Sequence, residues 1–235
     1  MEVKRSIRSG YFFFCALVVL ICFVLGYVLL VSIDQIEHPS GKELYFSIYT
    51  VYTQFGMLMF SVLMIYAISS DYREKNILFY KLMEYQWLRY YLTKWGVVFL
   101  ALSLPTMVGT VAVGMIYGDF SDTFVMLAHF EFVLLYELLL TAFWGFLFPS
   151  LMVAFLANLC FWLVSIVLST GVRSLHVLAY YDASNPVFLN LWEYLRTGNK
   201  EYLAIGNHVL YSAVLFGLIV GLVFLFRKRW EKNGI

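Results

Sequence analysis

The chain alternates long runs of apolar residues with short polar segments. Each run is about 20 residues or longer, the length an α-helix needs to cross the roughly 30 Å hydrocarbon core of a bilayer. The pattern predicts six membrane-spanning helices, at residues 11–31, 44–69, 95–116, 124–147, 151–170 and 204–226. We therefore expect an all-α membrane protein whose single transmembrane domain covers residues 1–235.

Only Phe148, Pro149 and Ser150 separate the fourth and fifth predicted helices. Proline lacks a backbone N–H and clashes with the preceding turn, so it is disfavoured inside a helix. The combined run is also about twice the length that one crossing needs. Two helices joined by a tight turn are therefore predicted.

The composition agrees with a membrane protein. Hydrophobic residues make up 62% of the chain and charged residues 13%, whereas a soluble domain is about 25% charged. Little chain remains for a soluble domain, so we expect membrane lipids, and no nucleic acid, among the partners. The three cysteines fall within predicted helices, and their spacing indicates neither a disulfide framework nor a metal site.

Lysine and arginine are distributed unevenly between the two sides of the predicted membrane domain. With the N-terminus in the cytoplasm, the cytoplasmic segments hold 12 of these residues, beginning with Lys4, Arg5 and Arg8, and the outer segments hold 4. Such an excess on one side is the positive-inside signal. Both termini are therefore predicted to be cytoplasmic.

The cytoplasmic segment between the second and third helices, residues 70–94, is charged yet rich in large apolar residues. A disordered tether would not have this composition. At helical spacing, one face would carry Ile77, Leu78, Lys81, Leu82 and Tyr85. The pattern predicts an interfacial amphipathic helix, followed by aromatic residues at headgroup level, namely Trp87, Tyr90, Tyr91 and Trp95. This helix could cover the span ends or dock a cytoplasmic partner, and spacing alone leaves both open.

In this segment Arg73-Glu74-Lys75 precedes Asn76-Ile77 and Leu78, and Lys94 opens the third helix. With the six-span pattern, these residues resemble a type-2 ABC transporter permease, the membrane subunit of an ATP-driven exporter. That family has both termini inside, a helical coupling loop between spans two and three, and its main outer segment between spans five and six. The present chain departs from the usual motif, with Asn76-Ile77 in place of Gly-Thr and Met83-Glu84-Tyr85 where proline is usual.

The resemblance implies a separate ATP-binding subunit and a second permease copy or related permease. The residues expected to contact the ATPase are Arg73, Glu74, Lys75, Asn76, Ile77, Leu78, Lys81 and Leu82. The chain lacks the phosphate-binding loop G-x-x-x-x-G-K-[ST]. We therefore expect ATP and Mg to bind the partner, and this chain to bind no cofactor or metal and to be no enzyme.

The fourth predicted helix carries three ionisable residues, His129, Glu131 and Glu137. Ionisable groups are expensive in the membrane and usually face a cavity or a partner. Counted from Phe124, Glu131 lies roughly 10 Å and Glu137 roughly 20 Å along the helix, while His129 and Glu137 lie on neighbouring faces and Glu131 points nearly opposite His129. These residues are candidates for a translocation path, and packing of the bundle or a dimer seam is the alternative.

The predicted function is export of a hydrophobic or amphipathic substrate through a multi-pass protein of a cell membrane, expected to be a bacterial plasma membrane. By the resemblance, candidate substrates are antimicrobial peptides, bacteriocins, toxin peptides, drugs and lipid-like molecules. One alternative is a ligand-binding membrane subunit or sensor, such as a vitamin-capture component, with no coupling helix. An intramembrane hydrolase that uses Glu131 or Glu137 is less consistent, because neither an adjacent Glu-Glu pair nor H-E-x-x-H occurs.

The outer segment between the fifth and sixth helices, residues 171–203, is the longest loop. Asn185-Pro186 is a turn signal, and the apolar residues after it predict a short interfacial helix that ends near Gly198. In the resembled family, helices in this region close the outer side of the pathway. A helix that simply rests on the membrane surface is an equally good interpretation.

Overall fold

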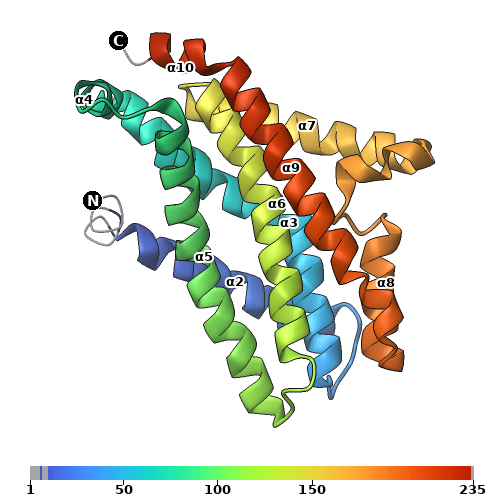
Figure 1. Ribbon diagram of the computed structural model, residues 1–235. Coiled ribbons are helices and arrows are strands. Elements are labelled where there is room, and N and C mark those ends of the chain that lie inside the picture. The colour runs from blue at the N-terminus through green and yellow to red at the C-terminus, as the bar shows by residue number, and fades with distance from the viewer. Residues whose placement is uncertain (1–5, 7–9, 234–235) are drawn as a thin grey trace.

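The computed structural model describes residue 6 and residues 10–233, and within these residues all regular structure is helical (Figure 1). The elements are α2 Tyr11–Ser32, α3 Gly41–Arg73, α4 Asn76–Leu82, α5 Trp87–Tyr117, α6 Thr123–Leu147, α7 Leu151–Gly171, η1 Arg173–Ala179, α8 Pro186–Thr197, η2 Lys200–Leu203, α9 Ile205–Leu225 and α10 Arg227–Asn233. The η elements are 3₁₀ helices.

Among the described residues, six helices are long and apolar enough to cross a membrane: α2, α3, α5, α6, α7, and α9 together with η2. This confirms the predicted number of spans, and the break at Pro149 lies between α6 and α7 as expected. The third span begins at Trp87, well before the predicted residue 95. Lys4, Arg5 and Arg8, which helped to predict the orientation, lie outside the described residues.

Helices α4 and α10 lie together at one end of the bundle, opposite the first turn of α3 (Figure 1). We call this the coupling end, and the opposite end the outer end. The predicted orientation places the coupling end in the cytoplasm, and that assignment stays a prediction.

The core is built on α3 and α6, which pack against each other in the middle of the bundle, with α2 and α5 on one side and α7, α8 and α9 on the other (Figure 1). Small residues bring the helices close, as is usual in membrane bundles. At Gly26 of α2, an added Cβ would lie 2.9 Å from the Cα of Ile48, and the Ser47 hydroxyl donates to the Gly26 carbonyl at 2.7 Å. The backbones of α2 and α3 are therefore in direct contact.

The segment after α7 dips into the bundle. Tyr136 of α6 donates its hydroxyl to the carbonyl of Leu178 at 3.0 Å, and Tyr211 of α9 donates to that of Val177 at 2.9 Å. Since Tyr136 lies roughly 20 Å along α6 from its first residue, η1 sits at membrane depth. Irregular backbone at that depth is tolerated only when protein surrounds it or it lines a water-filled cavity. Residues 172–185 thus form a re-entrant segment.

We predict that Gly26→Ala destabilises the protein. The new methyl group would overlap the Ile48 backbone, and overpacking of this kind costs about 1–3 kcal/mol. The matched control is Gly96→Ala in α5, where no atom lies within 4 Å of an added Cβ and the change should stabilise the helix by about 0.5–1 kcal/mol. Thermal unfolding in detergent measures both, and equal midpoints for the two variants would contradict the close contact.

Candidate coupling and translocation site

Helix α4 is bounded by two residues in the left-handed backbone region. Lys75, its N-cap, has φ 59°, and Glu84, just beyond Met83 at the C-cap, has φ 56°. The backbone N–H of Tyr85 then bonds to the carbonyl of Tyr80 at 2.9 Å, before α5 begins at Trp87. These two turns fold residues 74–86 into a short helical connection, which confirms the helix predicted between the second and third spans.

A buried ion pair anchors this connection. Asp71 in the last turn of α3 is fully buried, and its carboxylate lies 2.5 Å from Nζ of Lys94 in α5. Tyr90 donates its hydroxyl to the same carboxylate at 3.2 Å, and the side-chain amide of Asn76 donates to it at 3.3 Å. The Lys94 ammonium also lies 5.9 Å from the ring centroid of Tyr80. Asp71 therefore joins α3, α4 and α5 at one point.

The outward face of α4 is apolar and differs from the predicted one. Ile77 is fully buried, whereas Leu82 is 83% exposed and Phe79 53% exposed. Ile77 and Leu82 therefore do not share a face, and Tyr85 lies beyond the end of the helix. The observed face differs from the predicted one because α4 ends after seven residues and packs against the bundle along one edge.

The aromatic residues after α4 also differ from expectation. Tyr90 and Tyr91 are each 1% exposed, and Tyr91 donates its hydroxyl to the carbonyl of Leu139 in α6 at 3.1 Å. They pack inside the bundle and do not lie at a headgroup surface, because α5 already begins at Trp87.

The predicted ATPase contacts occupy different environments. Arg73, Glu74, Lys75 and Leu82 are exposed, Asn76, Leu78 and Lys81 are half-buried, and Ile77 is buried. The Glu74 carboxylate accepts a hydrogen bond from the amide of Asn76 at 2.9 Å. Lys81 donates to the backbone carbonyl of Glu231, so α4 is also linked to α10.

The structure does not bring together the three ionisable residues of α6. Glu131 points toward α5, where the Ser103 hydroxyl donates to it at 2.5 Å. Glu137 is 2% exposed and faces Gly56 of α3, and its Oε2 has no hydrogen-bond partner among the described residues. His129 points elsewhere, with Nδ1 2.8 Å from the carbonyl of Val125. No common path formed by the three is visible in this conformation.

His129 instead meets a second histidine, His208, which lies at the outer start of the sixth predicted span, residues 204–226. The ring centroids of His129 and His208 are 5.0 Å apart, and His208 stacks between Phe132 and Tyr181 at 5.4 and 5.6 Å. Both residues lie near the first turns of helices that start at the outer end, α6 and α9. Their equal depth under the predicted topology was the signal that could have found this pair.

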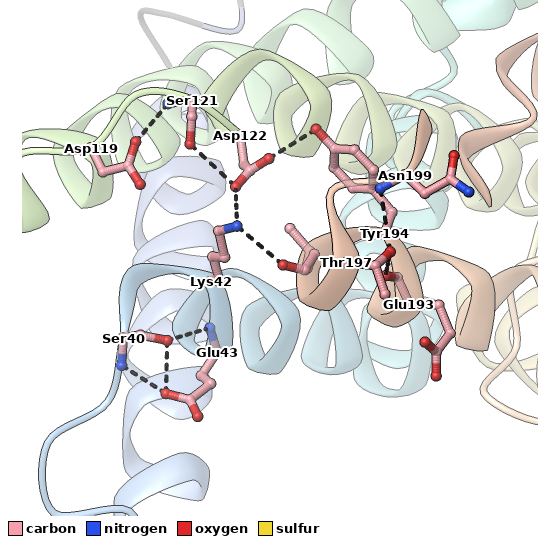
Figure 2. Close-up of polar contacts among 11 residues, drawn as sticks. Ser40, Lys42, Glu43, Asp119, Ser121, Asp122, Glu193, Tyr194, Thr197 and Asn199 are labelled. Atoms are coloured by element: carbon pink, nitrogen blue, oxygen red, sulfur yellow. Dashed lines mark hydrogen bonds and ion pairs between the residues drawn. The ribbon is translucent and has the colours of Figure 1, made fainter. Parts of the chain in front are cut away.

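A polar cluster at the outer end, which we call the outer clasp, consists of Lys42, Asp122 and Tyr194 (Figure 2). The Lys42 ammonium lies 3.5 Å from the Asp122 carboxylate and donates to the carbonyl of Leu195 at 3.1 Å. The Tyr194 hydroxyl donates to Asp122 at 2.9 Å. These contacts hold α8 against the starts of α3 and α6, and no sequence pattern pointed to them.

Burial, with the hydrogen bond to Asp122 as a second cause, raises the pKa of Tyr194 to about 12. The phenol therefore keeps its proton, and remains a donor to Asp122, throughout the physiological pH range.

Six spanning helices, a short helix beside a buried ion pair that joins the second and third of them, and a re-entrant segment before the sixth define a type-2 ABC permease. The chain belongs to the family described as the peptide export permease protein YydJ family, which matches residues 1–235. It is 28% identical over 241 residues to the "Probable peptide export permease protein YydJ" of Bacillus subtilis (strain 168), covering 100% of this chain and 99% of that protein. No solved structure matches the chain.

The family confirms the predicted class of a permease, and with the six spans it assigns the chain to a multi-pass location in the cell membrane. A role in membrane transport and export follows from the same membership. The residues expected to contact an ATPase or a substrate stay predictions.

We predict that Asp71→Ala destabilises the coupling end strongly. Removing the carboxylate beside the buried Lys94 ammonium should cost about 3–5 kcal/mol, as for other broken buried ion pairs. Replacing both partners, in Asp71→Leu with Lys94→Met, should recover most of that loss, because two apolar groups need no charge partner. Unfolding midpoints in detergent test this, with Glu37→Ala, an exposed carboxylate away from the joint, as control, and an Asp71→Ala midpoint equal to the control would refute the anchoring role.

Tyr194→Phe should weaken the outer clasp by about 1.5–3 kcal/mol at pH 7, the range for a hydrogen bond to a charged group. Because the pKa of Tyr194 in the folded protein, about 12, lies above the ordinary value of about 10, its contribution is complete below pH 10. It is lost as the pH rises through 12.

The difference in unfolding midpoint between the wild-type protein and Tyr194→Phe should therefore be constant from pH 7 to 9 and shrink above pH 10. Tyr202→Phe is the control, since Tyr202 is 38% exposed and its hydroxyl makes no hydrogen bond within the described residues. A difference that stays constant up to pH 12 would remove Tyr194 from the clasp.

Proposed function

We propose that the chain is the membrane subunit of an ATP-driven exporter and that a separate ATP-binding subunit docks on α4. The observation that carries this proposal is the buried contact of Asp71 with Lys94, Tyr90 and Asn76. A force applied to α4 passes through that contact into both α3 and α5. A rigid connection of this kind is what a soluble motor needs in order to move membrane helices.

The surface chemistry of α4 supports a protein partner. Phe79, Leu82 and Met83 are exposed at the coupling end, with Met83 at 44%. Apolar side chains gathered at one site and rimmed by charge are typical of a protein interface, and here the exposed Lys75 and Arg89 precede and follow the apolar residues along the chain. ATP and Mg would bind the docked subunit.

The substrate we propose is a hydrophobic or amphipathic peptide. The name of the Bacillus subtilis relative, a peptide export permease, supports this class. Inside the bundle the carboxyl of Glu137, with Oε2 unpartnered among the described residues, and the ring of His129 are the polar groups that a moving peptide could meet. A second copy of the chain, or a related permease, would complete the path.

The outer clasp fits a closed outer gate. It holds α8 against the starts of α3 and α6, and the re-entrant segment leads from α7 into α8 (Figure 1). Release of a peptide on the outer side requires these contacts to separate. In the proposed cycle, motion of α3 couples α4 at one end to Lys42 at the other, because both ends belong to the same helix.

A ligand-binding subunit without a transport cycle would need no anchored helix at the coupling end. The ion pair beneath α4 therefore favours the exporter over that alternative. Glu131 and Glu137 face different helices, which offers no paired carboxylates for a hydrolase.

The test is affinity purification of the tagged chain from its native membranes, with assay of ATP hydrolysis. We predict that an ATP-binding subunit co-purifies, and that Leu82→Glu reduces the amount recovered at least tenfold because it puts a charge in the apolar contact. Charge reversal in Glu74→Lys or Lys75→Glu should uncouple ATP hydrolysis from export while the chain stays folded. Lys200→Glu, an exposed change at the opposite end, is the control.

Retention of the ATPase by Leu82→Glu at the wild-type level would show that α4 is not the dock. A chain that purifies without any ATP-hydrolysing partner would overturn the exporter itself and favour a binding subunit or sensor.

A further inference from the structure

A cavity of about 270 Å³ opens at the coupling end, where the last turns of α3 meet the start of α7. Its lining includes Tyr66, Ser69, Ser70, Arg73, Ser150 and Leu151. No acidic side chain belongs to this lining in the described part of the chain. The cavity includes none of the ionisable residues of α6 or the outer clasp, and of its lining only Arg73 has been given an expected role above, as a contact of the ATPase.

The polar groups around this cavity all favour an anion. Helix α7 begins at Leu151, and its N-cap residue Ser150 makes no side-chain cap. The first backbone N–H groups of a helix lack intrahelical partners and carry the positive end of the helix dipole, which makes such an end ready to bind phosphate. Arg73 adds an exposed guanidinium that makes no hydrogen bond or ion pair within the described residues.

Ser69 provides an independent polar group for binding an anion. It is 6% exposed, it lines the cavity, and its hydroxyl has no hydrogen-bond partner in the described part of the protein. An unpaired buried hydroxyl costs about 1–3 kcal/mol. The neighbouring Ser70, by contrast, donates to the Ala67 carbonyl at 3.3 Å. An acceptor oxygen bound in the cavity would give Ser69 its partner.

The surface that leads to the cavity is an exposed stripe whose length suits a lipid acyl chain. Phe55, Val62 and Tyr66 follow one face of α3 and are 46%, 44% and 46% exposed. From Phe55 to Tyr66 this stripe is about 16 Å long, close to one half of the roughly 30 Å hydrocarbon core. It ends at Ser70 and Arg73. An acyl chain on the stripe would place its phosphate in the cavity, next to the guanidinium.

We propose that this cavity binds the phosphate of an anionic phospholipid from the leaflet at the coupling end. Arg73, Ser69 and the first turn of α7 hold the phosphodiester, and the exposed stripe of α3 receives an acyl chain. Because no carboxylate lines the cavity, a choline or ethanolamine headgroup gains no partner for its ammonium, so phosphatidylglycerol binds better than phosphatidylcholine. The lipid would lie between α3 and α7, whose membrane-spanning stretch is mostly not buried within the described structure.

The test uses the purified full-length chain in detergent, titrated with phosphatidylglycerol and followed by native mass spectrometry. We expect one tightly held lipid per chain, at least tenfold weaker binding in Arg73→Gln, and several-fold weaker binding in Ser69→Ala. The matched controls are Arg89→Gln, an exposed arginine at the same end, and Ser61→Ala, a buried serine of α3 whose hydroxyl bonds to the Leu58 carbonyl. Both controls should bind as the wild-type chain does.

Two further titrations, one with phosphatidylcholine and one with inorganic phosphate alone, identify the source of the phosphate. Equal binding of phosphatidylcholine, or wild-type affinity in Arg73→Gln, would overturn the proposal, and displacement of the lipid by millimolar inorganic phosphate would reassign the cavity to a free anion. Because the readout is lipid binding to the isolated chain, it does not depend on an ATP-binding subunit, and either proposal can fail without the other.

Discussion

Inside the hydrocarbon core of a bilayer no water is available to hydrogen-bond a polar group, so each such group must find its partner within the protein. This constraint explains the long helices, whose backbone groups pair internally, and it also explains the less regular parts. The re-entrant segment can depart from the α-helical conformation because Tyr136 and Tyr211 reach across from α6 and α9 to its carbonyls. Tyrosine residues thus have two roles in this chain: their rings pack in the bundle, and their hydroxyls donate hydrogen bonds.

The same constraint gives the coupling end its rigidity. A buried carboxylate and a buried ammonium must stay together, because separating them exposes each to an apolar surrounding. Asp71 and Lys94 therefore behave as a fixed joint between α3 and α5. The outer clasp is different in kind, since Lys42 is largely exposed to solvent and Tyr194 is a neutral donor. One end of α3 is thus held by a buried ion pair, and the other by a cluster whose lysine reaches solvent.

Hydropathy alone was sufficient to predict the number of spans and most of their first and last residues, because length and apolar composition are local properties of the chain. The tight turn at Pro149 was predictable for the same reason. The start of α5 was missed because Arg89 and Lys94 make its first turns look like a polar loop, and only the distant Asp71 explains why Lys94 can be buried. The face of α4 was misjudged since periodicity does not tell where a helix stops.

The candidate site was less accessible to sequence reasoning. His129, Glu131 and Glu137 were visible as polar residues in an apolar run, yet their separate partners on α9, α5 and α3 depend on how the helices pack. The contacts of Lys42 with Asp122 and of Tyr194 with Asp122 join segments far apart in the chain.

The joint at Asp71 also constrains biosynthesis. Until Lys94 has left the ribosome, the Asp71 carboxylate lacks the ammonium beside which it is buried, so the last turn of α3 is expected to reach its final packing only after the start of the third span has been synthesised.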